Sequence, residues 1–166
     1  MPTTTTREQQ KRWHEIVNDP LLNDLPYKIE TNARGQILLI PHTAHHADQQ
    51  GDLMALLGQH APNGLIRPEF PICTDSGTKM PDVVWITEAR RDKMRETGDP
   101  PTLAPEICIE VMSDANDWEE MHEKRALYRE AGAEEVWIVN RDGQIHVFRD
   151  DEREHSDLVP DFPSSL

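Results

Sequence analysis

The sequence contains no apolar run that approaches the roughly 18 residues a membrane-spanning helix requires. Residues 1–6 have neither the basic start nor the apolar stretch of a signal peptide. We therefore expect a soluble, cytoplasmic protein with no membrane partner. The hydrophobic fraction of 36% is low for a compact domain, but apolar runs recur regularly between residues 37 and 148. That regularity argues against wholesale disorder.

Cysteine is nearly absent as well, since the chain has only Cys73 and Cys108. Both lie in apolar stretches, and neither has the CxxC or Cys/His spacing of a zinc site. We expect two reduced, buried thiols that serve packing.

Positive charge is also scarce, because 17 basic residues stand against 31 acidic ones and leave a net charge of −14. This is the wrong sign for a protein that attracts nucleic acid through its overall field. Nucleic-acid binding would therefore have to be local. The basic residues gather in two segments, which form either a local phosphate-binding surface or ordinary solvated faces. These residues are Arg90, Arg91, Lys93 and Arg95, followed by Lys124, Arg125 and Arg129.

Apolar periodicity and turn residues predict the elements of a single 166-residue domain. Helices are expected at 6–18, 47–61 and 116–131, and strands at 27–31, 37–40, 65–73, 82–87, 107–111, 135–140 and 144–149. Thr6 and Gln9 fit a capping box for the first helix, and the proline-rich residues 96–105 fit a loop. This order of elements favours an α/β or α+β (α+β mixed) fold with a mixed β-sheet.

The two ends of the chain differ from its middle. We expect an N-terminal helical extension at 1–24, the main domain at 25–150 and a C-terminal tail at 151–166. The last segment is acidic and contains two prolines, so we expect it to be weakly ordered.

Two acids stand at the edges of apolar strands. Asp82 opens the run Val-Val-Trp-Ile, and Glu110 follows Ile-Cys-Ile. A carboxylate in an apolar setting is costly unless it is paired or binds a cation, and two that converge repel each other unless a cation lies between them. Paired carboxylate oxygens suit Mg²⁺, which also binds substrate phosphates. Phosphodiester cleavage is therefore one interpretation of these residues.

A structural interpretation competes with it. Asp82 could cap a turn after Pro81, and Glu110 could pair with an arginine on a neighbouring helix. Lys124 favours the chemical interpretation, because it lies on the helix directly after the Glu110 strand. A lysine that faces a metal could orient or deprotonate the attacking water and stabilise the developing negative charge.

Three histidines, His42, His45 and His46, raise the question of a zinc site. His42 and His46 have the four-residue spacing of a helix, but no Glu or Cys stands at a matching offset. We favour histidines at the start of a helix or on the surface, with zinc binding and substrate contact left as alternatives. Among the aromatic residues, Trp137 lies within a strand and is expected in the core. Tyr128 shares the helical face of Lys124, so it either touches the site or packs in the core.

Four short segments, taken in order, resemble a known family. They are Pro81-Asp82, Glu110-Val111-Met112-Ser113, Lys124 with Tyr128, and Ala-Gly-Ala-Glu-Glu-Val-Trp-Ile-Val at 131–139. Over residues 25–150 the chain resembles the restriction endonuclease family called Uma-two, within the PD-(D/E)XK nuclease superfamily. The resemblance implies a restriction-endonuclease-like core, with a mixed β-sheet flanked by helices.

The resemblance also implies roles for individual residues. Asp82 and Glu110 would bind the metal, with the backbone carbonyl of Val111 as a third ligand. Lys124 would be the catalytic lysine, supplied by the following helix because Met112 occupies the usual lysine position of the superfamily.

A further acid from the N-terminal half often joins such centres. Glu30 matches the hairpin glutamate of the family best and is our choice as a catalytic residue, ahead of Asp48 and Asp52.

We therefore hypothesise a Mg²⁺-dependent endonuclease that hydrolyses DNA, with Mn²⁺ as a possible substitute. The net charge of −14 motivates an alternative, a nuclease-fold module that no longer cuts and instead binds other proteins. Exposed strand edges and the resemblance suggest a homodimer, which would let two centres meet the two strands of a duplex.

Overall fold

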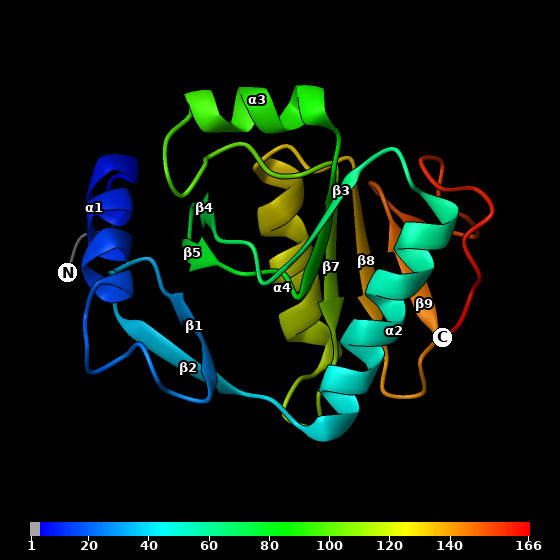
Figure 1. Ribbon diagram of the computed structural model, residues 1–166, viewed down its shortest axis with the longest axis horizontal. Coiled ribbons are helices and arrows are strands. Elements are labelled where there is room, and N and C mark those ends of the chain that lie inside the picture. Colours follow the sequence, from blue (N-terminus) through cyan, green and yellow to red (C-terminus); the bar gives the residue numbers. More distant parts are fainter. Residues whose placement is uncertain (1–3) are drawn as a thin grey trace.

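The apolar runs of the sequence form the centre of a six-stranded mixed sheet with helices on both faces (Figure 1). The computed structural model describes residues 4–166. The helices are α1 (Thr6–Val17), α2 (Ala44–His60), α3 (Glu88–Glu96) and α4 (Trp118–Glu130). The strands are β1 (Tyr27–Thr31), β2 (Ile37–Pro41), β3 (Leu65–Pro68), β4 (Ile72–Thr74), β5 (Gly77–Lys79), β6 (Val83–Ile86), β7 (Ile107–Val111), β8 (Glu135–Val139), β9 (Ile145–Phe148) and β10 (Glu152–Arg153). The predicted mixed α/β class is confirmed.

The main sheet has the strand order β10-β9-β8-β7-β6-β3. Strands β7 and β8 run parallel and the other neighbours run antiparallel. Helix α4 joins the parallel pair, as the long connection between parallel strands requires. Strands β6, β7 and β8 are buried along their whole length, which is why their sequences are nearly continuous apolar runs.

Each face of this sheet carries its own layer of core. On one face Leu57 of α2 packs in the same cluster as Trp85 of β6. On the other face Tyr128 of α4 shares a cluster with Cys108 of β7. Cys73 is buried as well, and both cysteines are free thiols, as predicted. No helix within residues 4–166 combines the length and apolar character needed to cross a membrane.

Helix α1 and two small hairpins, β1–β2 and β4–β5, lie beside the main sheet (Figure 1). Gln9 of α1 donates from Nε2 to the carbonyl of Thr74, 3.0 Å away in β4. The capping box of α1 uses Thr5 and Glu8, one residue earlier than predicted from Thr6 and Gln9. A run of threonines precedes the helix, so the sequence pattern fits both registers.

Two other element predictions need correction. The expected strand at 65–73 ends at Pro68, because Glu69 adopts a left-handed backbone with φ of 46°, and the chain resumes at Ile72 in the β4–β5 hairpin. Helix α3 was not predicted. Met94 is its buried side chain, so the segment carries no apolar periodicity, although Thr87 caps its start.

The C-terminal segment is packed, so the expectation of weak order at 151–166 is wrong. Val159 is buried in the core, and the ring of Phe162 lies 4.8 Å from that of Trp137 between centroids. The amide of Leu166 donates to the carbonyl of Gly143 at 2.8 Å. The division of the chain at residues 24 and 150 stays a prediction.

Candidate active site

The fold brings the acid and lysine side chains singled out in the sequence to one buried cluster. Asp82 lies directly before β6, Glu110 in β7, Glu30 in β1 and Lys124 on α4. The ammonium nitrogen of Lys124 lies 3.0 Å from Glu30 Oε1 and 3.4 Å from Glu110 Oε1. Four segments that are distant along the chain therefore meet at this point.

Lys28 is the member of this cluster that the sequence analysis missed. Its Nζ lies 3.1 Å from Asp82 Oδ1, 3.6 Å from Glu110 Oε2 and 3.9 Å from Glu30 Oε2. An ammonium group thus stands at the point where the carboxylates of Asp82 and Glu110 converge. Alternation along β1 places residues 28 and 30 on the same face, and this is the signal that could have identified it.

Asp82 uses both oxygens of its carboxylate. Oδ1 faces Lys28, and Oδ2 accepts a hydrogen bond of 2.7 Å from the amide of Val111. The Asp82 carbonyl accepts from Gln50 of α2 at 2.8 Å, which ties the start of β6 to that helix. Burial alone would raise the pKa of Asp82, but Lys28 and His46 hold it well below its usual range. The group is therefore a carboxylate at neutral pH.

Glu110 behaves differently although it lies in the same cluster. Burial raises its pKa to about 7, because Lys124 and Lys28 only partly offset desolvation and the repulsion from Asp82. The hydroxyl of Tyr128 donates to Glu110 Oε1 at 2.6 Å. Tyr128 thus both touches the site and packs in the core, which joins the two roles that the sequence left as alternatives.

Glu30 is the acid of the N-terminal half that reaches the cluster. Its Oε2 accepts from the amide of Met80 at 2.7 Å. Burial favours the neutral form of Glu30, but Lys124, Lys28 and the Met80 amide together outweigh that effect and lower its pKa. The two other candidates, Asp48 and Asp52, are exposed on α2.

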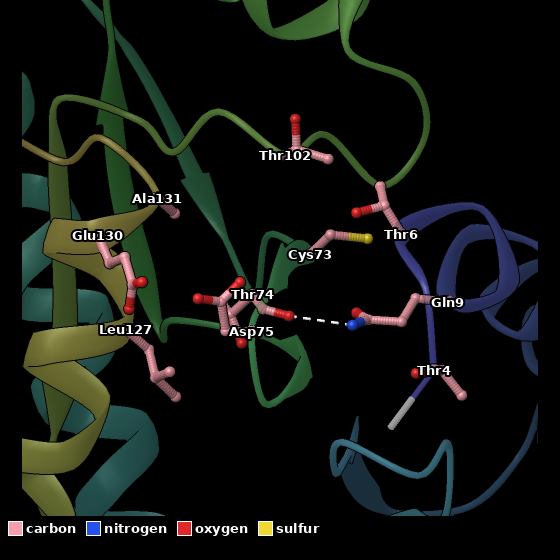
Figure 2. A pocket seen from close by; sticks show the side chains of 10 residues that line it. All are labelled: Thr4, Thr6, Gln9, Cys73, Thr74, Asp75, Thr102, Leu127, Glu130 and Ala131. Atoms are coloured by element: carbon pink, nitrogen blue, oxygen red, sulfur yellow. Dashed lines mark hydrogen bonds between the residues drawn. The ribbon is translucent and has the colours of Figure 1, made fainter. Parts of the chain in front are cut away.

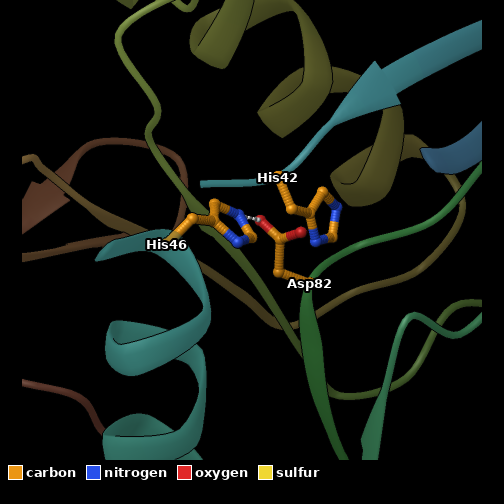
Figure 3. Close-up of side chains that lie close together, drawn as sticks. All are labelled: His42, His46 and Asp82. Carbon is orange, nitrogen blue, oxygen red and sulfur yellow. Dashed lines mark ion pairs between the residues drawn. The ribbon is translucent and has the colours of Figure 1, made fainter. Parts of the chain in front are cut away.

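Two of the three histidines lie beside Asp82 (Figure 3). His46 Nε2 is 3.3 Å from Asp82 Oδ2, and the rings of His42 and His46 are 4.5 Å apart between centroids. Helix α2 begins at Ala44, so His42 lies in the segment before the helix and not on its face. Its ring nevertheless lies beside that of His46. His45 is exposed, and its Nε2 contacts the carbonyl of Arg141.

The partly buried His42 and the buried His46 have pKa values that shift in opposite directions. Burial and the neighbouring His46 lower the pKa of His42. Burial also disfavours protonation of His46, but contact with the Asp82 carboxylate more than compensates and raises its pKa. The sequence analysis missed the link between these histidines and Asp82 because the acid comes from a different element, some 36 residues further along the chain.

Little free space remains among these side chains. A cavity of about 20 Å³ is lined by Lys28, His46, Glu110 and Lys124, which leaves room for about one water molecule. A larger hollow of about 410 Å³ lies between α1, the β4–β5 hairpin and the end of α4, where Gln9 projects into it (Figure 2). None of the acid and lysine residues of the cluster lines that hollow. The acid and lysine groups therefore lie in a tightly packed site with little free volume.

The basic segments are largely occupied by contacts within the protein. Arg90 donates to the carbonyls of Ala104 and Gly132, and Arg129 donates to the carbonyls of Ala133 and Glu134. These guanidinium groups fix loops around α3 and α4. For Arg90 and Arg129, a structural role is thus favoured over a phosphate-binding surface.

The chain is an α/β protein whose mixed sheet is flanked by helices, with Asp82 and Glu110 at neighbouring strands and Lys124 on helix α4. A family model, Uma2, described as "Putative restriction endonuclease", matches residues 9–164, and the chain belongs to this family. The expected family resemblance is thereby confirmed. Among curated protein sequences, none matches the chain.

The fold is similar, to different degrees, to two solved structures. A protein from Anabaena variabilis described as a "putative nuclease" is matched with a TM-score of 0.60 and 14% sequence identity, over 75% of each chain. The two proteins therefore share a fold. A DrdV–DNA complex solved by cryo-electron microscopy is matched with a TM-score of 0.43 and 10% identity, over 89% of this chain and 12% of that one. Similarity at that level establishes no common fold.

Proposed function

We propose that the protein is a metal-dependent endonuclease that hydrolyses phosphodiester bonds in DNA. In this proposal Asp82 and Glu110 bind Mg²⁺, Lys124 is the catalytic lysine and Glu30 completes the centre. The observation that carries it is the convergence of three buried carboxylates and two ammonium groups at one point of a nuclease-like fold. Membership of a restriction endonuclease family supports DNA as the substrate.

The residues suit a hard divalent cation. Asp82 Oδ1 and Glu110 Oε2 both approach the Lys28 ammonium, so they already form a cation position with oxygen ligands. Mn²⁺ prefers the same ligand type and would substitute for Mg²⁺. The backbone carbonyl of Val111 is proposed as a third ligand. Because Lys28 occupies this position, its side chain must withdraw when a metal ion binds.

Each residue of the centre would then have a distinct role in catalysis. A divalent ion bound there would polarise the phosphate and help to ionise the attacking water. Lys124, held by Glu30 and Glu110, would orient that water and donate hydrogen bonds to the phosphate oxygens as negative charge develops. Tyr128 would keep Glu110 in place through its 2.6 Å hydrogen bond.

Conservative substitutions test the proposal. Asp82→Asn and Lys124→Met should each lower Mg²⁺-dependent cleavage of plasmid DNA by at least about a hundredfold, since each removes a charge that acts on the reacting groups. Lys93→Met, on the far more exposed α3, is the matched control and should cleave like wild type. Circular dichroism verifies that the variants are folded. Undiminished cleavage by the folded Asp82→Asn variant would contradict the proposal.

A second candidate is a nuclease-fold module that no longer cuts and binds other proteins. The Lys28 ammonium between the two acids and the net charge of −14 favour it. Calorimetric titration with Mg²⁺ and Mn²⁺, together with gel shifts on single- and double-stranded DNA at low salt, separates the two. Absence of both metal and DNA binding favours the second candidate.

A homodimer is also proposed, with two centres that face the two strands of a duplex. Strand β2 supports it, because it lies at the edge of its hairpin and exposes Leu38 and Leu39. Light scattering at micromolar concentration should give twice the chain mass of 19.1 kDa. A single-chain mass contradicts the dimer without affecting the proposal for the centre.

A further inference from the structure

Beside the acid and lysine cluster, a second group of possible metal ligands gathers around the carboxylate of Asp82. His42, His46 and Asp82 each place one possible ligand atom within 4.8 Å of the other two (Figure 3). Two imidazoles and one carboxylate differ in chemistry from the all-oxygen position between Asp82 and Glu110. Imidazole nitrogen suits Zn²⁺, Co²⁺ and Ni²⁺ rather than Mg²⁺.

The distances fit a common ion. Two ligands of a tetrahedral Zn²⁺ with bonds of about 2.0–2.1 Å stand about 3.3 Å apart. His46 Nε2 and Asp82 Oδ2 are 3.3 Å apart. Oδ2 is also fixed by the Val111 amide, so this oxygen is held in place before any ion arrives. The ligand atom of His42 lies within 4.8 Å of the other two, so the ring must move closer to complete the set.

One ring nitrogen of each histidine lacks the hydrogen-bond partner that a buried imidazole nitrogen usually has. Within residues 4–166, His46 Nδ1 and His42 Nε2 are buried atoms without a hydrogen-bond partner. His42 Nε2 lies 3.5 Å from a carboxylate oxygen of Glu69. A carboxylate beside the second nitrogen of a metal-binding histidine is a common way to orient the ring. This arrangement leaves Nδ1 of His42 as the atom for the ion.

We propose that His42, His46 and Asp82 form a binding site for one Zn²⁺ or a similar late first-row ion, with Glu69 orienting His42. The site shares Asp82 with the proposed Mg²⁺ position but uses its other oxygen. Metal binding at this site does not require the protein to cleave DNA, so the proposal can be tested independently of the nuclease proposal.

Calorimetric titration of the full chain, prepared without a polyhistidine tag, with ZnCl₂ tests the site. Wild type should bind one Zn²⁺ per chain, and His42→Ala should bind at least about a hundredfold more weakly because a direct ligand is lost. His45→Ala is the matched control, since His45 is exposed and contacts Arg141 instead. It should bind Zn²⁺ like wild type.

A second measurement identifies the ligands. Co²⁺ bound to the wild-type protein should give a visible absorption band of a low-coordinate nitrogen site, and His42→Ala should abolish it. His42 is only partly buried, so this variant should fold even if substitution of buried His46 does not. Glu110→Gln should keep Zn²⁺ binding while it weakens Mg²⁺ binding. Equal loss of Zn²⁺ binding in Glu110→Gln and His42→Ala, or wild-type Zn²⁺ binding by His42→Ala, overturns the proposal.

Discussion

At the scale of single residues, Lys28 supplies the positive charge that balances the carboxylates of the acid cluster. Its ammonium contacts three carboxylates, and those contacts raise its pKa despite nearly complete burial. The protein therefore carries its own cation where the proposed Mg²⁺ would bind. Any added metal ion must compete with a group that is covalently attached and already desolvated.

Replacement of Lys28 tests this competition directly. Lys28→Met should tighten Mg²⁺ binding about tenfold or more, because it removes the competing charge and leaves Asp82 and Glu110 to repel each other until a cation binds. Lys79→Met is the control, since that lysine is also buried but its ammonium donates to the carbonyl of Thr31. Calorimetry gives both affinities. Unchanged Mg²⁺ affinity in Lys28→Met would contradict the competition.

Glu110 gives the cluster a pH dependence of definite sign. Its folded-state pKa of about 7 exceeds its ordinary value of 4.5, so between these values the folded chain keeps a proton that the unfolded chain releases. The contribution of Glu110 to stability is therefore full below about pH 4.5 and falls as the pH rises to about 7. Glu110→Gln removes this titration and still accepts the Tyr128 hydroxyl.

Urea unfolding at pH 5, 6, 7 and 8 measures the effect. The free energy of unfolding of wild type, relative to Glu110→Gln, should fall by up to a few kcal/mol across this range. The pH dependence that Asp82 contributes has the opposite sign. Because its pKa is lowered in the folded chain, its contribution to stability is lost only as the pH falls below this range. Parallel pH profiles for the two proteins would refute the role assigned to Glu110.

At the scale of elements, the turn from α2 into β3 requires a glycine. A Cβ at Gly64 would overlap the indole of Trp85, whose Nε1 donates to the carbonyl of Ala61 in the same turn. Gly64→Ala should therefore lower the free energy of unfolding by about 1–3 kcal/mol through overpacking. Gly51 lies within α2 with open space around it, so Gly51→Ala should raise the free energy of unfolding by about 0.5–1 kcal/mol. Chemical denaturation compares the two, and equal effects would contradict the argument.

The elements that could be predicted from sequence are those with a clear apolar pattern. Strands β6, β7 and β8 have continuous apolar runs, and α4 ends at Glu130, just before Gly132, whose φ of 108° fits the predicted glycine stop. Helix α3 and the β4–β5 hairpin were missed because they bury few apolar side chains of their own and depend on neighbours for position.

The same limit applies to the candidate site. Asp82, Glu110, Lys124 and Glu30 could be selected because strand edges and family motifs mark them. Lys28 shares a strand face with Glu30, and His42 and His46 have helical spacing, but these local patterns do not reveal their contacts with Asp82, which lies in another part of the chain. Lys28 and Asp82 are 54 residues apart in the sequence, so their contact is evident only in the folded structure.

At the scale of the whole molecule, the C-terminal segment completes the core. Phe162 packs against Trp137, so Phe162→Ala should lower the free energy of unfolding by about 2 kcal/mol, less than for a fully buried phenylalanine. The neighbouring exposed Asp161 provides the control, and Asp161→Ala should stay within about 0.5 kcal/mol of wild type. Thermal and urea unfolding measure both. Equal stability of the two variants would restore the view of this segment as a weakly ordered tail.

The net charge of −14 sets how the whole protein approaches DNA. The Debye length is about 30 Å at 0.01 M salt and about 8 Å at 0.15 M, so distant acids repel DNA only at low salt. Asp151, Glu154 and Asp161 are exposed acids in the C-terminal segment, and Asp151→Asn, Glu154→Gln and Asp161→Asn together change the net charge to −11. In a Lys124→Met background, which should bind without cutting, this triple variant should bind labelled duplex several-fold more tightly at 0.01 M salt. Fluorescence anisotropy should find equal affinities at 0.15 M, and a difference that persists there would mean that these acids contact the DNA directly.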